Sequence, residues 1–419
     1  MSPEPRADKR PWLLAGISRN TLLLGLVSFF NDVSSDMIQP HLLAIFLSSV
    51  LNVSAAGIGL IGGITDAVAS VLKALSGWLS DALRRRKPTI LAGYWIAACA
   101  RPLLAMSTSM WHVLVLRSAD RLGKGARSAP RDAMIADSTP EGYRGKAFGL
   151  HRALDTAGAA AGMLLAAFLL WRLGTDHLAT SLRIIFLAAS LPGILVIGLI
   201  VWGVREQADT AGQASSRPAA MWHLKQALTR ELVKWYAVVF LFWLGNSSDM
   251  FLILKARGLG VALWQVPLLV FVMSVVYAGF SIPAGLLSDR LGRRAVIVAG
   301  WTFYALVYIG FAFAGTVWTM FALFAAYGLY YAMTGGAERA LVADLAAPAV
   351  RGTALGLYHF VSGAAALPAS VICGALWEWD RLGVYGPRVA LGFGAACALL
   401  AIALLVVMNP KPRAVPQKA

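Results

Sequence analysis

One charged segment occurs twice in the sequence, and this duplication constrains the fold more than any other feature. The segment GWLSDALRRRK begins at Gly77 and reappears as GLLSDRLGRRA from Gly285. Each copy follows a long apolar run and is followed by another. Further pairs recur in the same order: Ser-Ser-Asp-Met at 34–37 and 247–250, and Ala-Asp with Arg-Gly at 136–145 and 343–352. The chain is therefore predicted to consist of two repeats, each about half of its length.

The composition places these repeats in a membrane. Apolar residues make up 58% of the 419 residues and charged residues 14%, and the mean hydropathy is +0.67. Such a chain offers little polar surface to water, whereas lipid suits it. The net charge of +16 could indicate a nucleic-acid partner, but the basic residues are concentrated between apolar runs, as in a membrane protein. The expected surroundings are a lipid bilayer, and no nucleic-acid partner is predicted.

Apolar runs long enough to cross the hydrocarbon, about 20 residues as a helix, predict an all-α membrane protein. Twelve transmembrane helices are predicted, at 20–50, 55–83, 87–108, 110–137, 142–172, 180–203, 229–257, 263–290, 294–315, 317–345, 349–378 and 386–408. They form an N-terminal six-helix bundle (1–204), a cytoplasmic linker (205–228) and a C-terminal six-helix bundle with a short cytoplasmic tail (229–419). Long internal repeats in an apolar chain are typical of secondary transporters.

The distribution of lysine and arginine predicts the orientation. Basic residues occupy the N-terminus, 84–87, 144–146, the linker, 290–294 and the tail, whereas the loops near 51–55, 107–110 and 314–317 carry none. Because basic loops favour the cytoplasmic side, both termini are predicted to be cytoplasmic in a bacterial-type inner membrane.

The sequence shows no motif of an enzyme or a metal centre. Cys99, Cys373 and Cys397 lie in apolar runs without pairing motifs or metal spacing. Walker, Gly-rich phosphate-binding, zinc and nucleophile-elbow motifs do not occur. The sequence therefore predicts neither catalysis, nor a cofactor, nor a bound metal.

Acidic residues inside the first predicted helix indicate a function. An ionisable group at the centre of a membrane helix costs roughly 2.5–3.5 kcal/mol. Asp32 and Asp36 are one turn apart and share a face, with Asn31 beside them. Two carboxylates in a low dielectric repel when both are ionised, so this pair is suited to carry a proton. The alternative is that an arginine neutralises them permanently and the cluster serves only the structure.

The fourth predicted helix is the most highly charged. Arg117, Arg121 and Lys124 share one face, which must point to a water-filled cavity or to the carboxylates of neighbouring helices. A network that only packs the first half together is the alternative. The predicted proton-coupling residues are Asp32, Asp36, Arg117, Arg121 and Asp155.

The predicted substrate cavity takes polar residues from both repeats. Asp249 is the repeat mate of Asp36, and Glu338-Arg339 occupies the repeat position of Arg131-Asp132. The pair Glu338-Arg339 could form a gate or neutralise itself. Asp66 is interpreted as a packing or gating residue, and His359 as a core histidine. The predicted cavity residues are Asn31, Asp120, Lys124, Arg152, Asn246, Asp249, Glu338 and Arg339.

The duplicated segment resembles the loop signature of the major facilitator superfamily. Residues 285–294 match every position of Gly-x-Leu-(Ala/Ser)-Asp-Arg-x-Gly-Arg-Arg/Lys, and residues 77–86 depart from it at Ala82 and Arg84. The resemblance covers essentially the whole chain and implies the superfamily fold, with two pseudo-symmetric six-helix bundles. It also implies a cytoplasmic gate. The gate residues are Gly77, Asp81, Arg85, Arg86, Asp137, Gly285, Asp289, Arg293 and Arg294.

Two further segments are similar to family signatures. Arg121-Leu-Gly-Lys-Gly125 is similar to the helix 4 pattern Arg-x-x-x-Gly, whose arginine is thought to influence protonation of a nearby acid. Gly158-Ala-Ala-Ala-Gly162 keeps part of the glycine spacing of the antiporter signature but lacks its Gly-Pro, which leaves the direction of transport open.

These features together predict a proton-coupled secondary transporter that moves a small organic solute by alternating access. The pattern is closest to twelve-helix drug and small-solute antiporters, which favours efflux. The alternative is an uptake symporter for an organic anion, a siderophore or a metal chelate. A sensor or a membrane-anchored lipid enzyme is disfavoured because no soluble domain or nucleophile motif occurs. The expected partners are the solute and protons, and the resemblance implies a monomer.

Overall fold

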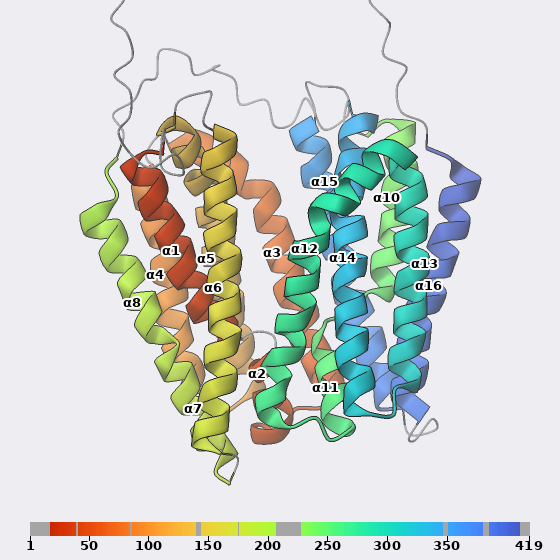
Figure 1. Cartoon of the computed structure of the whole chain (residues 1–419), viewed down its shortest axis with the longest axis horizontal. Coiled ribbons are helices and arrows are strands. Elements are labelled where there is room, and N and C mark those ends of the chain that lie inside the picture. The colour runs from red at the N-terminus through yellow and green to blue at the C-terminus, as the bar shows by residue number, and fades with distance from the viewer. Residues whose placement is uncertain are drawn as a thin grey trace, which may run out of the picture.

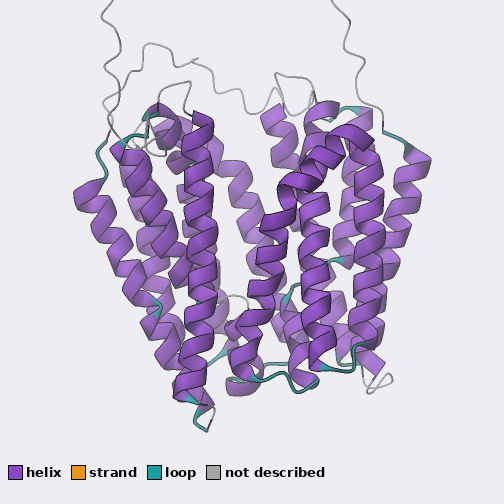
Figure 2. Ribbon diagram, viewed as in Figure 1, coloured by secondary structure: helices purple, strands orange, loops and turns teal. Residues whose placement is uncertain are grey.

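The described part of the chain is helical, as a computed structural model shows (Figures 1 and 2). The structure describes residues 17–38, 41–83, 86–139, 144–174, 176–206, 228–346, 351–379 and 385–410. No strand occurs in these ranges.

The first half comprises α1 (Arg19–Asp36), α2 (His41–Ile45), the π-helical turn η1 (Phe46–Val50), α3 (Ala55–Leu83), α4 (Arg86–Ala105), α5 (Met110–Asp137), α6 (Arg144–Leu173), α7 (Leu178–Ala188), α8 (Ser190–Gly198) and the π-helical turn η3 (Leu199–Gly203). The second half comprises α10 (Arg230–Gly245), α11 (Met250–Gly258), the 3-10 turn η4 (Leu263–Gln265), α12 (Val266–Leu291), α13 (Arg293–Phe313), α14 (Val317–Leu345), α15 (Arg351–Trp377) and α16 (Gly386–Met408).

Nine stretches within the described residues are long and apolar enough to cross a membrane. The helices α3, α4 and α5 are not among these nine stretches but run alongside them in the bundle, so the arrangement is consistent with twelve crossings (Figure 1). Hydropathy alone does not select α5, because this helix contains many charged residues. Several of them, such as Arg117, Asp120 and Arg127, are buried in the protein interior. The start of α1 and the end of α16 lie at the same end of the bundle, as an even number of crossings requires. The domain boundaries stay a prediction, since 207–227 lies outside the described residues.

Two of the predicted helices are interrupted by several residues, and a third, 180–203, is divided at Ala189 into α7 and α8; this corrects the prediction. The span 20–50 is divided into α1, α2 and η1, and the span 229–257 into α10 and α11. Both interruptions fall at the duplicated Ser-Ser-Asp-Met segment. The hydropathy of these spans stays high across the few polar residues, so an apolar run does not reveal that its helix is discontinuous.

Close helix contacts depend on glycine. In the first half, a Cβ added at Gly162 of α6 would lie 2.6 Å from the carbonyl oxygen of Val33 of α1. The glycines that resemble an antiporter signature therefore have a packing role. Between the halves, α3 packs against α15 and α6 against α12. A Cβ at Gly63 of α3 would lie 2.7 Å from Cα of Leu367 of α15, so the two backbones touch, as in other small-residue membrane interfaces.

A carboxylate joins the halves where α3 begins. Oε1 of Glu378, just after α15, accepts a hydrogen bond from the amide of Ala55, and Oε2 accepts one from Ala56 at 3.4 Å. The first amides of a helix have no partner within it and favour a negative charge. Glu378 thus supplies those acceptors to α3 from the other half of the chain.

The contact between α3 and α15 leads to a stability prediction. We expect Gly63→Ala to destabilise the protein by about 1–3 kcal/mol, because overpacking forces the two backbones apart. Thermal denaturation of the purified protein in detergent would measure the change. Gly356→Ala on α15 is the matched control, since a Cβ there meets nothing within 4 Å. Equal melting temperatures for the two variants would contradict the prediction.

Candidate functional site

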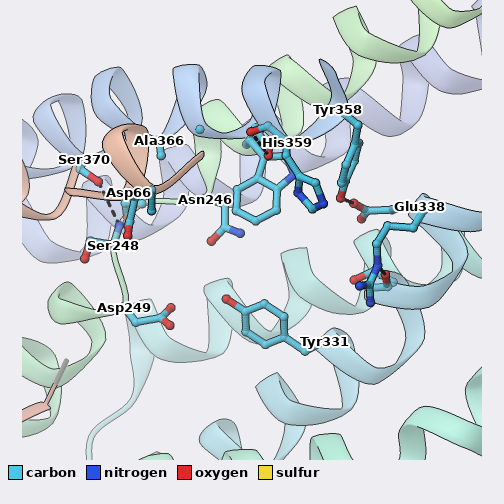
Figure 3. Close-up of a pocket in the computed structure, with 18 of the residues that line it drawn as sticks. Asp66, Asn246, Ser248, Asp249, Tyr331, Glu338, Tyr358, His359, Ala366 and Ser370 are labelled. Carbon is cyan, nitrogen blue, oxygen red and sulfur yellow. Dashed lines mark hydrogen bonds between the residues drawn. The ribbon is translucent and has the colours of Figure 1, made fainter. Parts of the chain in front are cut away.

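A cavity of about 400 Å³ lies between the two halves. The first half contributes residues of α3 and α5 to its wall, and the second half contributes the break between α10 and α11 together with α14 and α15. Figure 3 shows Asn246 and His359 on one side of this space and Asp249 and Tyr331 on the other. The charged residues of the wall are Asp66, Arg121, Lys124, Asp249, Glu338 and Arg339.

A smaller cavity of about 230 Å³ adjoins the first. The two cavities share Asp66, Arg121, Ser248 and Asp249 in their walls. Arg117 lines only the smaller one. Acidic and basic side chains from both halves therefore face the same continuous polar region, as expected of a site at the repeat interface.

The break between α10 and α11 positions the second-half side chains. Tyr304 donates a hydrogen bond from its hydroxyl to the carbonyl of Gly245 (3.1 Å), where α10 ends. The amide of Ser248 donates to Oγ of Ser370 on α15 (3.1 Å). Backbone that leaves the helix inside a membrane needs such partners, because hydrocarbon provides none. The break turns Asn246 and Asp249 toward the cavity, where the sequence predicted them.

Tyrosine side chains fix the orientation of these two residues. The hydroxyl of Tyr327 donates to Oδ1 of Asp249 (3.0 Å) and lies 3.4 Å from Oδ1 of Asn246. Tyr308 donates to the same amide oxygen at 3.5 Å. The Nδ2 group of Asn246, only 5% exposed, has no hydrogen-bond partner among the described residues. Asn246 therefore presents an unused donor in the cavity wall.

The acidic residues of α1 gather at the first-half break. Oδ1 of Asp32 accepts from Nδ2 of Asn31 (2.9 Å), and its carboxyl lies within hydrogen-bonding reach of that of Asp155 on α6. Asp36 is the last residue of α1 and interacts electrostatically with Arg121 and Lys124. The structure thus brings together four of the predicted proton-coupling residues: Asp32, Asp36, Arg121 and Asp155.

Lys124 connects this acidic cluster to the cavity. Its side chain is exposed in the cavity wall and interacts electrostatically with both Asp32 and Asp36. The acids themselves do not line the cavity. Lys124 therefore links the acidic cluster electrostatically to the cavity wall.

Asn31 and Asp120 lie in a buried network around Arg101 of α4 rather than in the cavity wall. Arg101 is 1% exposed and donates to Oδ1 of Asn31 (3.0 Å), Oγ of Ser34 (2.7 Å) and Oδ1 of Asp120 (3.3 Å). Arg127 stacks over a tyrosine ring of α4 and reaches the same oxygen of Asn31 at 3.4 Å. These contacts form a network that packs the first half together, which was the alternative interpretation of the charges on the fourth predicted helix.

Arg152 also lies away from the cavity. Its side chain is 68% exposed on α6 and pairs with Asp155 at 3.2 Å. Three residues predicted for the cavity, Asn31, Asp120 and Arg152, thus have other surroundings in the structure.

The pair Glu338-Arg339 does not neutralise itself by a direct ion pair among the contacts of the described residues. Glu338 is 2% exposed and accepts a hydrogen bond from Nε1 of Trp301 (2.9 Å). It also accepts one from the hydroxyl of Tyr358 (2.6 Å), as Figure 3 shows. Arg339 is exposed and donates to the carbonyl of Gly335 (2.6 Å). Both residues line the larger cavity, as predicted.

The second copy of the gate segment forms an ion-pair cluster. Arg293 pairs with Asp289 and, at 3.5 Å, with Asp344 on α14. Asp344 is the repeat mate of Asp137, which the resemblance assigns to the gate. Arg294 binds the carbonyl of Leu405 (3.1 Å), and Gly285 lies on α12.

The first copy is described only in part. Arg85 lies outside the described residues. Gly77, Asp81 and Asp137 belong to helices, but the structure does not describe their surroundings. The backbone amide of Arg86 donates to Glu206 at 3.0 Å, at the start of the predicted linker. The inter-half gate of the first copy stays a prediction.

The comparison with known proteins decides the family. The family model of the Major Facilitator Superfamily matches residues 24–367 and 247–419. An uncharacterised MFS-type transporter of Methanocaldococcus jannaschii is 36% identical over 396 residues, which are 93% of this chain and 95% of the relative. The chain belongs to the major facilitator superfamily.

Two further comparisons agree with this family. A cis,cis-muconate transport protein of Acinetobacter baylyi is 25% identical over 383 residues, covering 85% of this chain and 88% of that protein. The solved structure of the nucleoside transporter NupG has a TM-score of 0.77 at 12% identity, over 93% of this chain and 99% of that one, and so shows the shared fold. The protein is a multi-pass membrane transporter of small solutes and not an enzyme.

Several residues of this transporter's cavity were not predicted for it. Asp66, interpreted as a packing or gating residue, and His359, interpreted as a core histidine, are both in the wall. Tyr330, Tyr331 and Tyr358 join them. Asp66 is polar within an apolar helix, which was a usable signal. The tyrosines gave no such signal in the sequence. Aromatic residues are common throughout membrane helices, and their spacing does not show which helix face lines the cavity.

The network around Arg101 leads to a second prediction. We expect Arg101→Leu to destabilise the transporter by about 3–5 kcal/mol, because it removes the closer charge partner of the buried carboxylate of Asp120 and a donor to Ser34. The melting temperature of the purified protein would report the loss. The control is Arg152→Leu, which removes an exposed arginine whose ion pair contributes about 0–1 kcal/mol. A drop no larger than that of the control would show that the network is dispensable.

Proposed function

We propose that the protein is a proton-coupled transporter that exports a small organic solute by alternating access. The observation that carries this proposal is the position of Lys124, which faces both the acids of α1 and the solute cavity. A proton on Asp32 or Asp36 removes a negative charge beside Lys124, and this changes how Lys124 and Arg121 interact with a solute. Protonation and solute binding would then be linked, as coupling requires.

The carboxyl pair Asp32 and Asp155 supports a proton site. Two carboxyl groups within hydrogen-bonding reach repel when both are ionised and share a proton favourably. Oγ of Ser28 donates to Oδ1 of Asp155 at 2.7 Å, which leaves the other oxygen of Asp155 for Asp32 or Arg152. In this proposal, Asp36 and Asp32 load and release the proton, while Asp155 holds the cluster in place.

A second function is supported by the cations of the cavity wall. Arg121, Lys124 and Arg339 would attract an organic anion, and the Acinetobacter relative is named as a muconate transport protein. In proton-coupled uptake, the same residues would move an organic anion in the direction opposite to export. The two functions differ in the direction of solute movement relative to the proton gradient.

Transport assays with Asp36→Asn test the coupling. Inside-out vesicles with an acid interior and a pH-sensitive dye would be given cations, neutral amphiphiles, organic anions and metal chelates. We expect one class to release protons in the wild type and none to do so in Asp36→Asn, because asparagine cannot carry the proton.

The control for this assay is Asp176→Asn, which makes the same change at an exposed position between α6 and α7. Proton release by Asp36→Asn at the wild-type rate would end the proposal. If no solute releases protons in the wild type, right-side-out vesicles would test the uptake of anions.

The ion pairs of Arg293 lead to a prediction about the conformational cycle. We expect Asp344→Asn to lower the turnover rate several-fold while the KM for the solute changes little, because the pair lies at a helix end and not in the cavity. Stability should change by about 0–1 kcal/mol, as for other exposed pairs. The same measurements on Lys234→Gln, which removes a partly buried ion pair of α10 far from the gate segment in sequence, provide the control. A turnover rate equal to that of the control would remove Asp344 from the gate.

A further inference from the structure

The side chain of Arg117 is buried without adequate partners. It is 2% exposed, in the first third of α5, and its Nε and Nη1 groups form no hydrogen bond with the described residues. The nearest acid, Asp120, lies 3.7 Å from Nη1, beyond hydrogen-bonding distance. Leaving donors of a buried charged group without acceptors is costly. A guanidinium in this state is suited to receive an acceptor from outside the chain.

Asp120 cannot neutralise Arg117 fully because it is shared. Its Oδ1 accepts from Arg101 at 3.3 Å, and its Oδ2 is the atom that faces Arg117. One carboxylate thus lies between two guanidinium groups, and Arg121 adds a third cation to its surroundings. The interior of the first half carries surplus positive charge at this point.

The smaller cavity lies directly beside this surplus charge. Its wall contains Arg117 and Arg121 together with the hydroxyl-bearing Thr65 and Ser248. Two acids, Asp66 and Asp249, also line this wall, and Asp66 interacts electrostatically with Arg117. Asp249 is also held by Tyr327, which keeps one of its oxygens away from the arginines.

We propose that the smaller cavity is an anion subsite in which the guanidinium group of Arg117 binds the carboxylate of a small organic acid. Arginine offers planar paired donors that match a carboxylate, and such bonds are about twice as strong as neutral ones. This inference names the substrate class and rests on the proposed function, since it places the solute in the transport pathway.

The adjoining cavity accommodates the rest of the molecule. Beyond the shared wall residues, its space of about 400 Å³ is lined by Trp243, Tyr330 and Tyr331, which suit a planar or apolar carbon skeleton. The unused Nδ2 donor of Asn246 faces the same space and suits a carbonyl or hydroxyl oxygen of the solute. The carboxylate end and the carbon skeleton of one ligand thus meet different, continuous parts of the site.

Equilibrium binding to the purified full-length protein tests the subsite without any gradient. The probes are benzoate and adipate, each compared with its neutral amide, with thermal stabilisation and calorimetry as readouts. We expect at least one acid to bind the wild type and its amide to bind at least about tenfold more weakly. Arg117→Gln should weaken binding of the acid by about 10- to 100-fold, that is about 1.4–2.8 kcal/mol, and Arg117→Lys should retain part of it.

The matched control is Arg172→Gln, which removes the same charge at the exposed end of α6 and should bind as the wild type does. Both variants are first compared for monodispersity and for melting temperature without ligand. If Arg117→Gln does not fold, Arg117→Lys carries the test, because it keeps the charge but loses the paired donors.

Four outcomes would overturn the inference. The first is equal affinity for acid and amide, and the second is unchanged affinity in both Arg117 variants. The third is that sodium chloride stabilises the wild type as much as the acid does and that Arg117→Gln abolishes this stabilisation. This result would assign the subsite to an inorganic anion. Proton-coupled movement of cations or neutral solutes in vesicles, with no acid bound, would refute the subsite and leave the proposed function standing.

Discussion

Interrupting a helix inside a membrane leaves backbone amides and carbonyls without partners, and hydrocarbon offers no water to replace them. This transporter interrupts two helices, and each interruption is supported by side chains from neighbouring helices. At the α10–α11 break, Tyr304 and Ser370 supply hydrogen bonds to the backbone. Near the end of α1, Arg101 of α4 donates to the carbonyl of Asn31 at 3.3 Å. The breaks can therefore persist, and the polar residues around them become the walls of a solute pathway.

The charges of α5 depend on the same surroundings. A helix with this many arginine and lysine residues could not face lipid. Its side chains divide into two sets: Arg127 and Asp120 join the buried network of Arg101, whereas Arg121 and Lys124 face the cavity. The first set ties α1, α4 and α5 together, and that rigid support holds the second set in the cavity wall. The two sets thus occupy adjacent faces of one helix.

The sequence predicted the parts of this arrangement that depend on one-dimensional patterns. Apolar runs gave the bounds of α3, α5 and α14 as the structure has them, and the shared face of Arg117, Arg121 and Lys124 follows from helical spacing. The parts that depend on how helices are rotated against one another could not be predicted. Asn31 and Asp120 belong to a network rather than to the cavity because Arg101, on a third helix, reaches both. Asp66 is in the cavity because α3 turns that face toward α11.

The two repeats share a sequence signal but place it in different electrostatic surroundings. Asp36 is the last residue of α1, at the carbonyl end of a helix, and its nearby charges are the cations Arg121 and Lys124. Its repeat mate Asp249 immediately precedes α11, at the amide end of a helix, where Tyr327 binds it. A carboxylate at an amide end is stabilised by the helix itself, whereas one at a carbonyl end depends on neighbouring cations. The duplicated aspartates are therefore not interchangeable, and an asymmetric division of roles between the halves follows from where each helix is interrupted.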